Sequence, residues 1–362
     1  MAGNIFHSLG KESSIFKNEK VLMPDYIPNE LLHRENEIKE LALCLRTASK
    51  GERPENIIVA GPPGTGKTCS VRYVLKQLGE YSKSILPIYI NCWEFSTRHS
   101  ILTQIAIGLG EFVPRRGIAT DEITINIVET LKKEKRTPII ALDEVDKLAS
   151  QVEDIKILYD LARSNEIFSI NIGLIGISNS LTFLSRIDSR IKSSLSQRIL
   201  EFERYTPQQL RDILKERAKI AFVSGAVDED ILGLCAGIGM KNNGDARIAI
   251  QTLWLAGREA EKRNSGNVSI DDVKLAANLA PRESKLGEIK FDKVENEIID
   301  ILRKKGEITT TEIYALINRK PRTVRKYILI LIKKGILKSK SLPRSTTDGR
   351  KPRLIWLKEP GK

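Results

Sequence analysis

Residues 61–68 read Gly-Pro-Pro-Gly-Thr-Gly-Lys-Thr, after the apolar run Ile57–Ala60 and before Cys69–Leu78, a segment with helical periodicity. This order of Gly, four residues, Gly, Lys and Thr between a strand and a helix is the pattern of a phosphate-binding loop. Its glycines let backbone N–H groups curl around phosphates, and the N-terminus of the following helix adds a favourable dipole. The pattern therefore predicts a nucleotide site on an α/β sheet.

The polar positions of this loop have separate chemical roles. Lys67 would place a positive charge on the terminal phosphates, and the Thr68 hydroxyl would ligate Mg²⁺. We expect the cofactors to be ATP or ADP together with Mg²⁺. The residues predicted to hold them here are Gly61, Gly64, Thr65, Gly66, Lys67, Thr68 and Cys69.

An acidic pair, Asp143 and Glu144, follows the apolar run Ile139–Leu142. In open α/β sheets, ligands bind beyond the carboxyl ends of the strands. We expect Asp143 to hold Mg²⁺ directly or through water, and Glu144 to orient and deprotonate the attacking water. The alternative is an acidic first turn of a helix, which the helix dipole also favours.

Asn179 follows another apolar run, Ile172–Ile177. If that strand lies between the strand of Asp143 and the strand before the loop, the Asn179 amide can contact the γ-phosphate or the water. The alternative is an Asx turn, in which the side chain bonds to its own backbone. Its predicted role therefore rests on its position.

Short apolar runs alternate with helix-length segments over the first two hundred residues. Such continuous apolarity is typical of strands buried on both faces, so we expect a parallel sheet with helices on both sides. A helix is also expected at Arg34–Ala48, where apolar residues recur at helical spacing. The expected strands are Ile57–Ala60, Leu86–Asn91, Ile139–Leu142, Ile172–Ile177 and Ile199–Phe202.

The rest of the chain has two different textures. After Thr206, a candidate N-cap, the pattern is helical at 207–222, 228–240, 245–262 and 270–278. From residue 291, three helices precede two strands around a polar turn at 343–351, which is the winged-helix variant of helix-turn-helix. The ranges expected are a loosely ordered arm at 1–28, a nucleotide-binding domain at 29–205, a helical domain at 206–281 and a winged-helix domain at 282–362.

The positive charge of the chain is concentrated near its C-terminus. The whole chain carries a formal charge of +13, and residues 282–362 hold 22 Lys and Arg against 10 Asp and Glu, a net of +12. Many charges of both signs are typical of thermophile surfaces, but that does not explain a local imbalance. The asymmetry favours a nearly neutral body with a basic module that binds a polyanion.

The most basic stretch lies inside the predicted winged helix. Residues 319–353 contain 13 basic residues and one acidic residue, and the third helix of the domain separates basic from apolar positions. One face could pack on the domain while the other enters the major groove of duplex DNA. The alternative is a solvated basic face. The candidate DNA contacts are Arg319, Lys320, Arg322, Arg325 and Lys326 on or before the helix, and Arg344, Arg350 and Lys351 in the wing.

Together these motifs resemble those of the AAA+ ATPases. From about Asp25 onward the chain is similar to the archaeal origin-recognition initiator proteins, relatives of the eukaryotic origin recognition complex. The resemblance implies an AAA+ domain, a helical lid and a C-terminal winged helix. The segments that carry it are Pro24–Pro28, His33–Glu35, Gly61–Thr68, Leu142–Asp146, Gly176–Asn179, Asp188–Ser194, Tyr205–Thr206 and Gly244–Arg247.

The resemblance also implies roles for residues that composition alone does not mark. Asn179 and Arg247 match the first and second sensors of the γ-phosphate, while Tyr205 and Arg217 match positions that contact the nucleotide. Arg190 lies in the segment of the trans-acting arginine, where Arg186 and Arg198 are close and Ser194 replaces an Arg of some relatives. An insertion after the first sensor that touches DNA in the family corresponds to 181–192, with Arg186 and Lys192 as contacts.

These expectations favour an origin-binding initiator or regulator of DNA replication, in which slow ATP hydrolysis acts as a conformational switch. The expected partners are the repeats of a replication origin and, by the resemblance, the replicative helicase and paralogous initiators. Off DNA we expect a monomer or weak self-association. The alternatives are a winged-helix transcription regulator with an ATPase switch, or a DNA motor of the clamp-loader or branch-migration type.

Two observations bear on location. No stretch approaches the ~18–20 unbroken apolar residues that cross a bilayer, and the N-terminus lacks the apolar core of a signal peptide. The four cysteines form no close pair and fit buried thiols in a reducing cytoplasm, and together with the three scattered histidines they argue against a metal site built from them. We expect a cytoplasmic, nucleoid-associated protein with no membrane partner.

Overall fold

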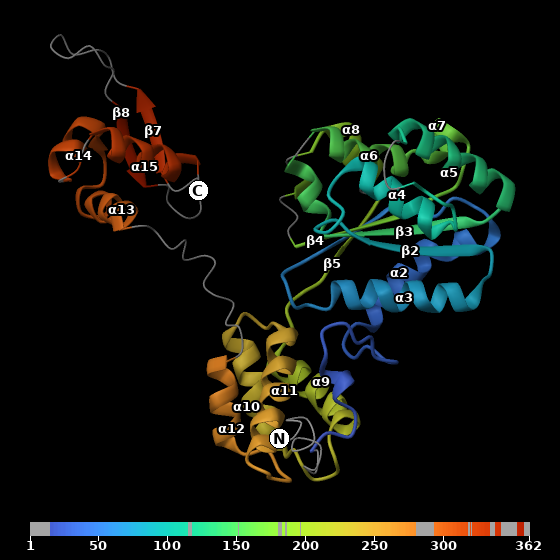
Figure 1. Ribbon diagram of the computed structural model, residues 1–362, viewed down its shortest axis with the longest axis horizontal. Helices are drawn as coiled ribbons and strands as arrows, with labels where there is room; N and C mark the ends of the chain where they lie inside the picture. The colour runs from blue at the N-terminus through green and yellow to red at the C-terminus, as the bar shows by residue number, and fades with distance from the viewer. Residues whose placement is uncertain are drawn as a thin grey trace, which may run out of the picture. The chain divides into compact units, whose positions relative to one another are not determined.

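The computed structural model forms two compact units, Met1–Arg282 and Glu283–Lys362 (Figure 1). The residues described are 15–114, 118–150, 152–179, 183–184, 187–195, 197–279, 293–317, 319, 321–333, 337–341 and 353–357.

The first unit contains a five-stranded sheet in which every neighbouring pair is parallel, in the order β2-β3-β4-β1-β5. β1, β3 and β4 are buried at every residue, which explains their unbroken apolar sequence. Because β4 lies between β3 and β1, the loops after these three strands leave the same edge of the sheet. The strands are β1 (Ile57–Ala60), β2 (Ile85–Asn91), β3 (Thr137–Asp143), β4 (Gly173–Ser178) and β5 (Arg198–Glu201).

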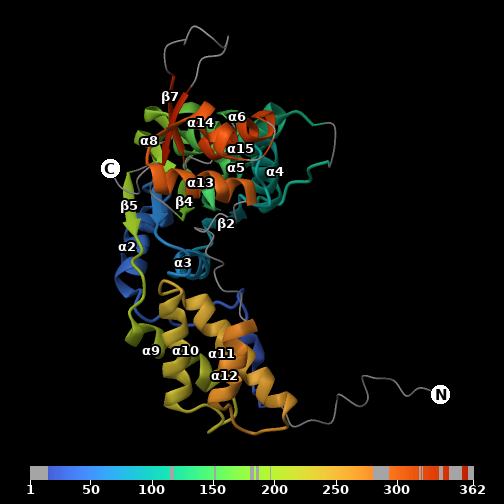
Figure 2. The same cartoon turned by 90° about the vertical axis from the view of Figure 1, so that its left-hand side faces the viewer.

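Helices cover both faces of this sheet (Figures 1 and 2). Successive residues of β1 point to opposite faces, so Ile57 packs with α2 and α3, whereas Ile58 packs with α4, α5, α6 and α8. The helices are α2 (Glu35–Leu45), α3 (Lys67–Tyr81), α4 (Arg98–Gly108), α5 (Thr120–Glu134), α6 (Val152–Ala162), α7 (Ser164–Phe168) and α8 (Ser189–Leu195). The expected α/β arrangement is therefore present.

The helical part of the first unit consists of α9 (Pro207–Ala221), α10 (Glu229–Lys241), α11 (Ala246–Lys262) and α12 (Ile270–Leu279). Thr206 caps α9 in a capping box with Gln209, and Pro207 occupies the first helical turn, as the sequence predicts. Asp228 and Asp245 cap α10 and α11 through their carboxylates.

Residues 15–22 differ from the expectation of a loosely ordered arm. Ile15, Phe16, Val21 and Leu22 are buried in the helical core, and the rings of Phe16 and Phe222 lie 4.7 Å apart. Val21 and Leu22 belong to a short 3₁₀ helix, η1 (Glu19–Leu22). The segment has no helical periodicity because its apolar residues pack individually into the core formed by α9, α10, α11 and α12.

The second unit packs three helices against a small antiparallel sheet. Ile298, Ile313, Val324, Leu331 and Ile355 belong to its core. The expected two-stranded hairpin gains a third short strand, since the sheet order is β6-β8-β7. Its elements are α13 (Lys293–Lys305), β6 (Ile308–Thr309), α14 (Thr310–Leu316), α15 (Pro321–Lys333), β7 (Leu337–Ser341) and β8 (Arg353–Leu357).

Among the described residues, no helix has both the length and the apolar character needed to span a bilayer.

Candidate functional site

The loop of residues 61–68 joins β1 to α3 at the edge where β3 and β4 also end. Gly64 and Gly66 have φ of 73° and 88°, a conformation that side chains with a Cβ rarely adopt. The Lys67 ammonium donates to the carbonyls of Gly61 and Pro62, both at 2.7 Å, and to Oδ1 of Asn179 at 3.1 Å. The structure thus brings the loop, its lysine and the predicted first sensor together.

Burial lowers the pKa of Lys67 to about 8, although the nearby carboxylate of Asp143 acts in the opposite direction. The Arg247 guanidinium contributes to the lowering. A buried ammonium favours an anionic partner, because an anion restores the interaction energy that the lysine loses with water. The electrostatics of the loop therefore suit phosphate.

Asp143 is buried at the end of β3 and accepts three hydrogen bonds. Its Oδ2 accepts from the Thr68 hydroxyl and the Tyr89 hydroxyl, both at 2.7 Å, and its Oδ1 accepts from the backbone N–H of Glu144 at 2.8 Å. A carboxylate beside a hydroxyl is an all-oxygen donor set of the kind that Mg²⁺ prefers. Thr68 and Asp143 therefore fit the metal that the sequence predicts.

Tyr89 is a part of this cluster that sequence reasoning missed. Burial and the adjoining Asp143 carboxylate raise the pKa of its hydroxyl well above the usual range, so it remains a donor. The Arg72 guanidinium lies 5.3 Å from the centre of its ring. Tyr89 lies beside Asp143 because of the parallel register of β2 and β3. This register pairs Tyr89 with Ala141, two residues before Asp143.

Glu144 has a φ of 53°, in the left-handed region that non-glycine residues seldom occupy. Such a conformation costs about 1–3 kcal/mol and is concentrated at functional sites. Asp146, on the next 3₁₀ turn (η3, Val145–Ser150), accepts from the Ser178 hydroxyl at 3.0 Å. This contact ties the segment after the acidic pair to the end of β4, beside Asn179.

The helical part of the unit reaches the loop through Asp245, another residue that sequence reasoning missed. Its carboxylate is 2% exposed and pairs with Arg247 through Nε at 3.1 Å and Nη2 at 2.6 Å. The backbone N–H of Ala246 donates to the Gly64 carbonyl at 3.2 Å, and a Cβ on Gly64 would overlap the Asp245 carboxylate. Asp245, the N-cap of α11, therefore holds Arg247, the predicted second sensor, near the loop.

Cys69, Tyr205 and Arg217 gather on another side of the loop. The Tyr205 hydroxyl lies 2.6 Å from where a Cβ on Gly66 would be, and the Arg217 charge acts on the half-buried Cys69 thiol, whose pKa is raised by loss of contact with water. Arg217 donates to the Val21 carbonyl at 2.7 Å, and its guanidinium lies 4.5 Å from the Tyr26 ring centre. The N-terminal segment thus joins this group.

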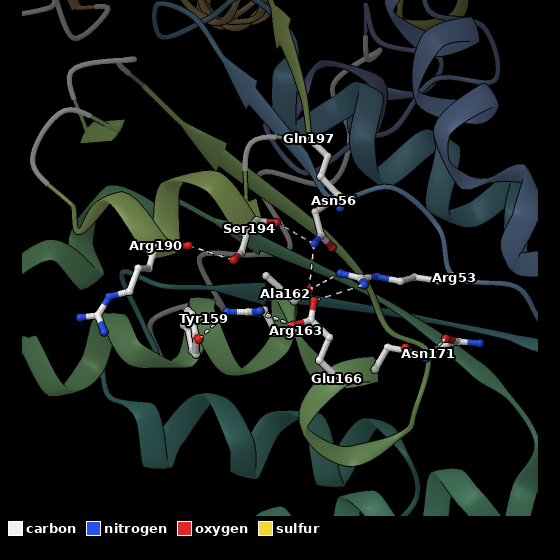
Figure 3. Close-up of polar contacts among 11 residues, drawn as sticks. Arg53, Asn56, Tyr159, Ala162, Arg163, Glu166, Asn171, Arg190, Ser194 and Gln197 are labelled. Carbon is white, nitrogen blue, oxygen red and sulfur yellow. Dashed lines mark hydrogen bonds and ion pairs between the residues drawn. The ribbon is translucent and has the colours of Figure 1, made fainter.

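Arg190 is not brought to the loop of its own chain. Its exposed guanidinium pairs with Asp188 at 3.0 Å and points away from the polar cluster of Arg53, Arg163 and Glu166 in Figure 3. Its carbonyl accepts from the hydroxyl of Ser194 at 2.9 Å. Lys192, on the same helix, is also exposed, whereas Arg186 lies outside the described residues.

In the second unit, α15 has the expected division into two faces. Arg322, Arg325 and Lys326 are exposed, whereas Val324 and Ile328 are buried. Arg319, before the helix, is exposed as well. The other candidates, Lys320, Arg344, Arg350 and Lys351, lie outside the described residues.

Two family models match the first unit of the chain. The AAA domain family matches residues 50–184, and the Cdc6 AAA+ ATPase-type lid domain family matches residues 211–278. The ORC1-type DNA replication protein 1 of Sulfurisphaera tokodaii is 37% identical over 322 residues, which are 88% of this chain and 78% of that protein. The chain belongs to the ORC1-type DNA replication proteins. Another member, from Pyrococcus horikoshii, is 37% identical over 327 residues, 86% of this chain and 78% of that one.

Solved structures of ORC1-type and related proteins have the same architecture. The Aeropyrum pernix ORC1 protein, in complex with DNA, is 34% identical with a TM-score of 0.71, covering 96% of this chain and 94% of that one. Cdc6p from Pyrobaculum aerophilum is 25% identical with a TM-score of 0.68, covering 95% and 94%. The fold is therefore an AAA+ domain with a helical lid and a C-terminal winged helix. The Thermotoga maritima RuvB branch migration motor, 18% identical with a TM-score of 0.51, shares the fold alone.

The contact between loop and lid predicts different effects for two glycines of nearly equal φ. Gly64 (φ 73°) faces Asp245, whereas no atom of the described residues beyond its two chain neighbours lies within 4 Å of where a Cβ on Gly51 (φ 74°) would be. Gly51→Ala should cost only the backbone strain of about 1–2 kcal/mol. Gly64→Ala should cost about 1–3 kcal/mol more, because it also displaces the lid. Trypsin cleavage after the exposed Arg204 should accelerate in Gly64→Ala alone, and equal rates in both variants would contradict the contact.

Proposed function

We propose that this protein binds ATP or ADP with Mg²⁺ in the loop site and duplex DNA through its winged helix, and that it initiates or regulates replication at origins. The observation that carries the proposal is the meeting of four elements at one sheet edge: Lys67, Asn179, the pair Thr68 and Asp143, and the lid residue Asp245. Membership of the ORC1-type family and the DNA complex of the Aeropyrum pernix relative support it.

The proposed chemistry divides phosphate binding from hydrolysis. The loop N–H groups and Lys67 hold the phosphates, while Thr68 and Asp143 hold Mg²⁺, which neutralises phosphate charge when bound. Glu144 accepts a proton from water, and Asn179 orients the water or the γ-phosphate. Tyr205, Arg217 and Cys69 would surround the rest of the nucleotide.

The switch would act through the lid. Arg247 is paired with Asp245 and 63% exposed, so a terminal phosphate can compete with Asp245 for its guanidinium. The lid position then depends on whether the third phosphate is present. Such a device needs only slow hydrolysis, because the nucleotide works as a latch. The exposed side chain of Arg190, which pairs with its neighbour Asp188, suits a role in trans.

The domain ranges proposed are an AAA+ domain at 29–205, a lid at 206–281 and a winged helix at 282–362. The described part of the N-terminal segment, from residue 15, is added to the lid because of its buried contacts. Origin repeats are the proposed DNA, with helicase and paralogous initiators as further partners. The proposed location is the nucleoid.

The lowered pKa of Lys67 predicts a pH dependence of ADP affinity. The folded protein prefers the neutral amine above pH about 8, whereas bound phosphate favours the ammonium. Affinity measured by calorimetry should fall about twofold from pH 7 to 8 and weaken up to about tenfold per pH unit above it. Lys67→Met should bind weakly with no such change. Constant affinity of the natural protein up to pH 9.5 would count against this role of Lys67.

Replacement of Glu144 tests the assignment of the general base. Glu144→Gln should keep ATP affinity and lower single-turnover hydrolysis by about 10²–10⁴-fold, because the amide cannot take a proton. Glu80→Gln, at an exposed position of α3, is the matched control and should hydrolyse normally. Hydrolysis by Glu144→Gln at the natural rate would remove Glu144 from the mechanism.

The basic face of α15 predicts a salt-dependent loss of DNA binding. Replacing Arg322, Arg325 and Lys326 together by Ala should weaken duplex binding and reduce the slope of log affinity against log salt by about 3. The control removes three exposed lysines of the lid, each paired with an acid three residues away: Lys219, Lys262 and Lys274. Gel shifts across salt concentrations measure the slope of log affinity against log salt for both triple variants. An equal slope in the two would exclude α15 as the DNA contact.

A further inference from the structure

Arg34 is a buried cation to which the proposed chemistry assigns no role. Its side chain is 5% exposed, and it precedes α2 in the His33–Glu35 segment. Burying a guanidinium is costly unless its donors are satisfied. The contacts that satisfy Arg34 therefore indicate what the residue is there to hold.

The Arg34 guanidinium joins three segments that are distant in sequence. Its Nε donates to the Thr65 carbonyl of the phosphate loop at 2.9 Å, and its Nη2 donates to the Glu203 carbonyl at 2.6 Å. Its Nη1 donates to Oε1 of Glu37 on α2 at 2.9 Å. One planar group thus connects the loop, the start of α2 and the connector between β5 and α9.

The same guanidinium also contacts the connector from its face. It lies 4.0 Å from the ring centre of Tyr205, a stacking distance for a cation over an aromatic ring. Tyr205 immediately precedes Thr206, the cap of the first lid helix, and its hydroxyl reaches the loop near Gly66. Arg34 therefore contacts the loop and the point where the lid begins.

We propose that Arg34 is a positioning residue that transmits the state of the phosphate loop to the lid connector. This rests on the proposed nucleotide function. A shift of the Thr65 carbonyl on phosphate binding moves a donor of Arg34, and the rigid guanidinium passes that movement to Glu203 and Tyr205. Lysine cannot do this equally well, because its ammonium lacks the planar fork that serves two carbonyls and a ring at once.

Hydrogen exchange with and without ADP tests the coupling in the full chain. In the natural protein, ADP should slow exchange at the loop (64–70) and at the connector and first turn of α9 (204–210). In Arg34→Met, which keeps an apolar stem of similar length, ADP should slow exchange at the loop only, with affinity reduced about tenfold. Arg34→Lys should give an intermediate effect at the connector.

Glu37→Gln is the matched control. It removes the ion pair with Arg34 but leaves the donors to Thr65 and Glu203 and the stack on Tyr205. Protection of the connector by ADP should therefore stay at the natural level. A purely structural role of Arg34 would lower thermal stability in both variants without separating loop from connector.

The outcomes distinguish this proposal from the proposed function. Connector protection at the natural level in folded Arg34→Met would overturn the coupling, and if that variant does not fold, the same result in Arg34→Lys would overturn it. Protection of the loop without the connector in the natural protein would overturn the coupling alone. No protection anywhere in the natural protein, with no measurable ADP affinity, would overturn the nucleotide function and the coupling with it.

Discussion

The order of β3, β4 and β1 is the constraint on which the candidate site depends. Parallel strands that are neighbours deliver their following loops to one edge, so Asp143, Asn179 and the loop of 61–68 meet there although they are far apart in sequence. The hydrogen bonds from Lys67 to Asn179 and from Thr68 to Asp143 are direct consequences of that order. If β4 were not a neighbour of β1, Asn179 would be separated from the lysine.

The contact between the lid and the loop is a second constraint on the site. Gly64 has no side chain, so the Asp245 carboxylate can lie against the loop while it also caps α11 and pairs with Arg247. A carboxylate beside a phosphate site is electrostatically unfavourable once phosphate is bound, unless its charge is compensated. The Arg247 pair supplies this compensation only while the guanidinium stays on Asp245, so competition from a terminal phosphate would make the lid contact sensitive to what the loop holds.

Local patterns were enough to predict the elements that act locally. The loop motif, the acidic pair and the cap at Thr206 each need only a few consecutive residues, and β1 has the expected bounds. Arg34, Tyr89 and Asp245 could not be predicted in the same way, because their partners are set by tertiary contacts. Arg34 is 31 residues from Thr65 and 169 from Glu203, so no spacing rule connects them. Phe16 was missed for the same reason, since the whole AAA+ domain separates it in sequence from its packing partner Phe222.

The N-terminal segment is attached to the lid. Glu19 accepts from the Trp254 indole at 2.6 Å, and Arg217 of α9 donates to Val21, so residues 15–22 are attached to two lid helices. The same chain then continues through Tyr26, beside Arg217, to Arg34 at the phosphate loop. The lid, with residues 15–22 packed on it, is therefore joined to the AAA+ domain by two paths along the chain, one through residues 203–206 and the other through residues 23–34. Arg34 is at the end of one path and stacks on Tyr205 in the other, which is why a single guanidinium can link both to the nucleotide site.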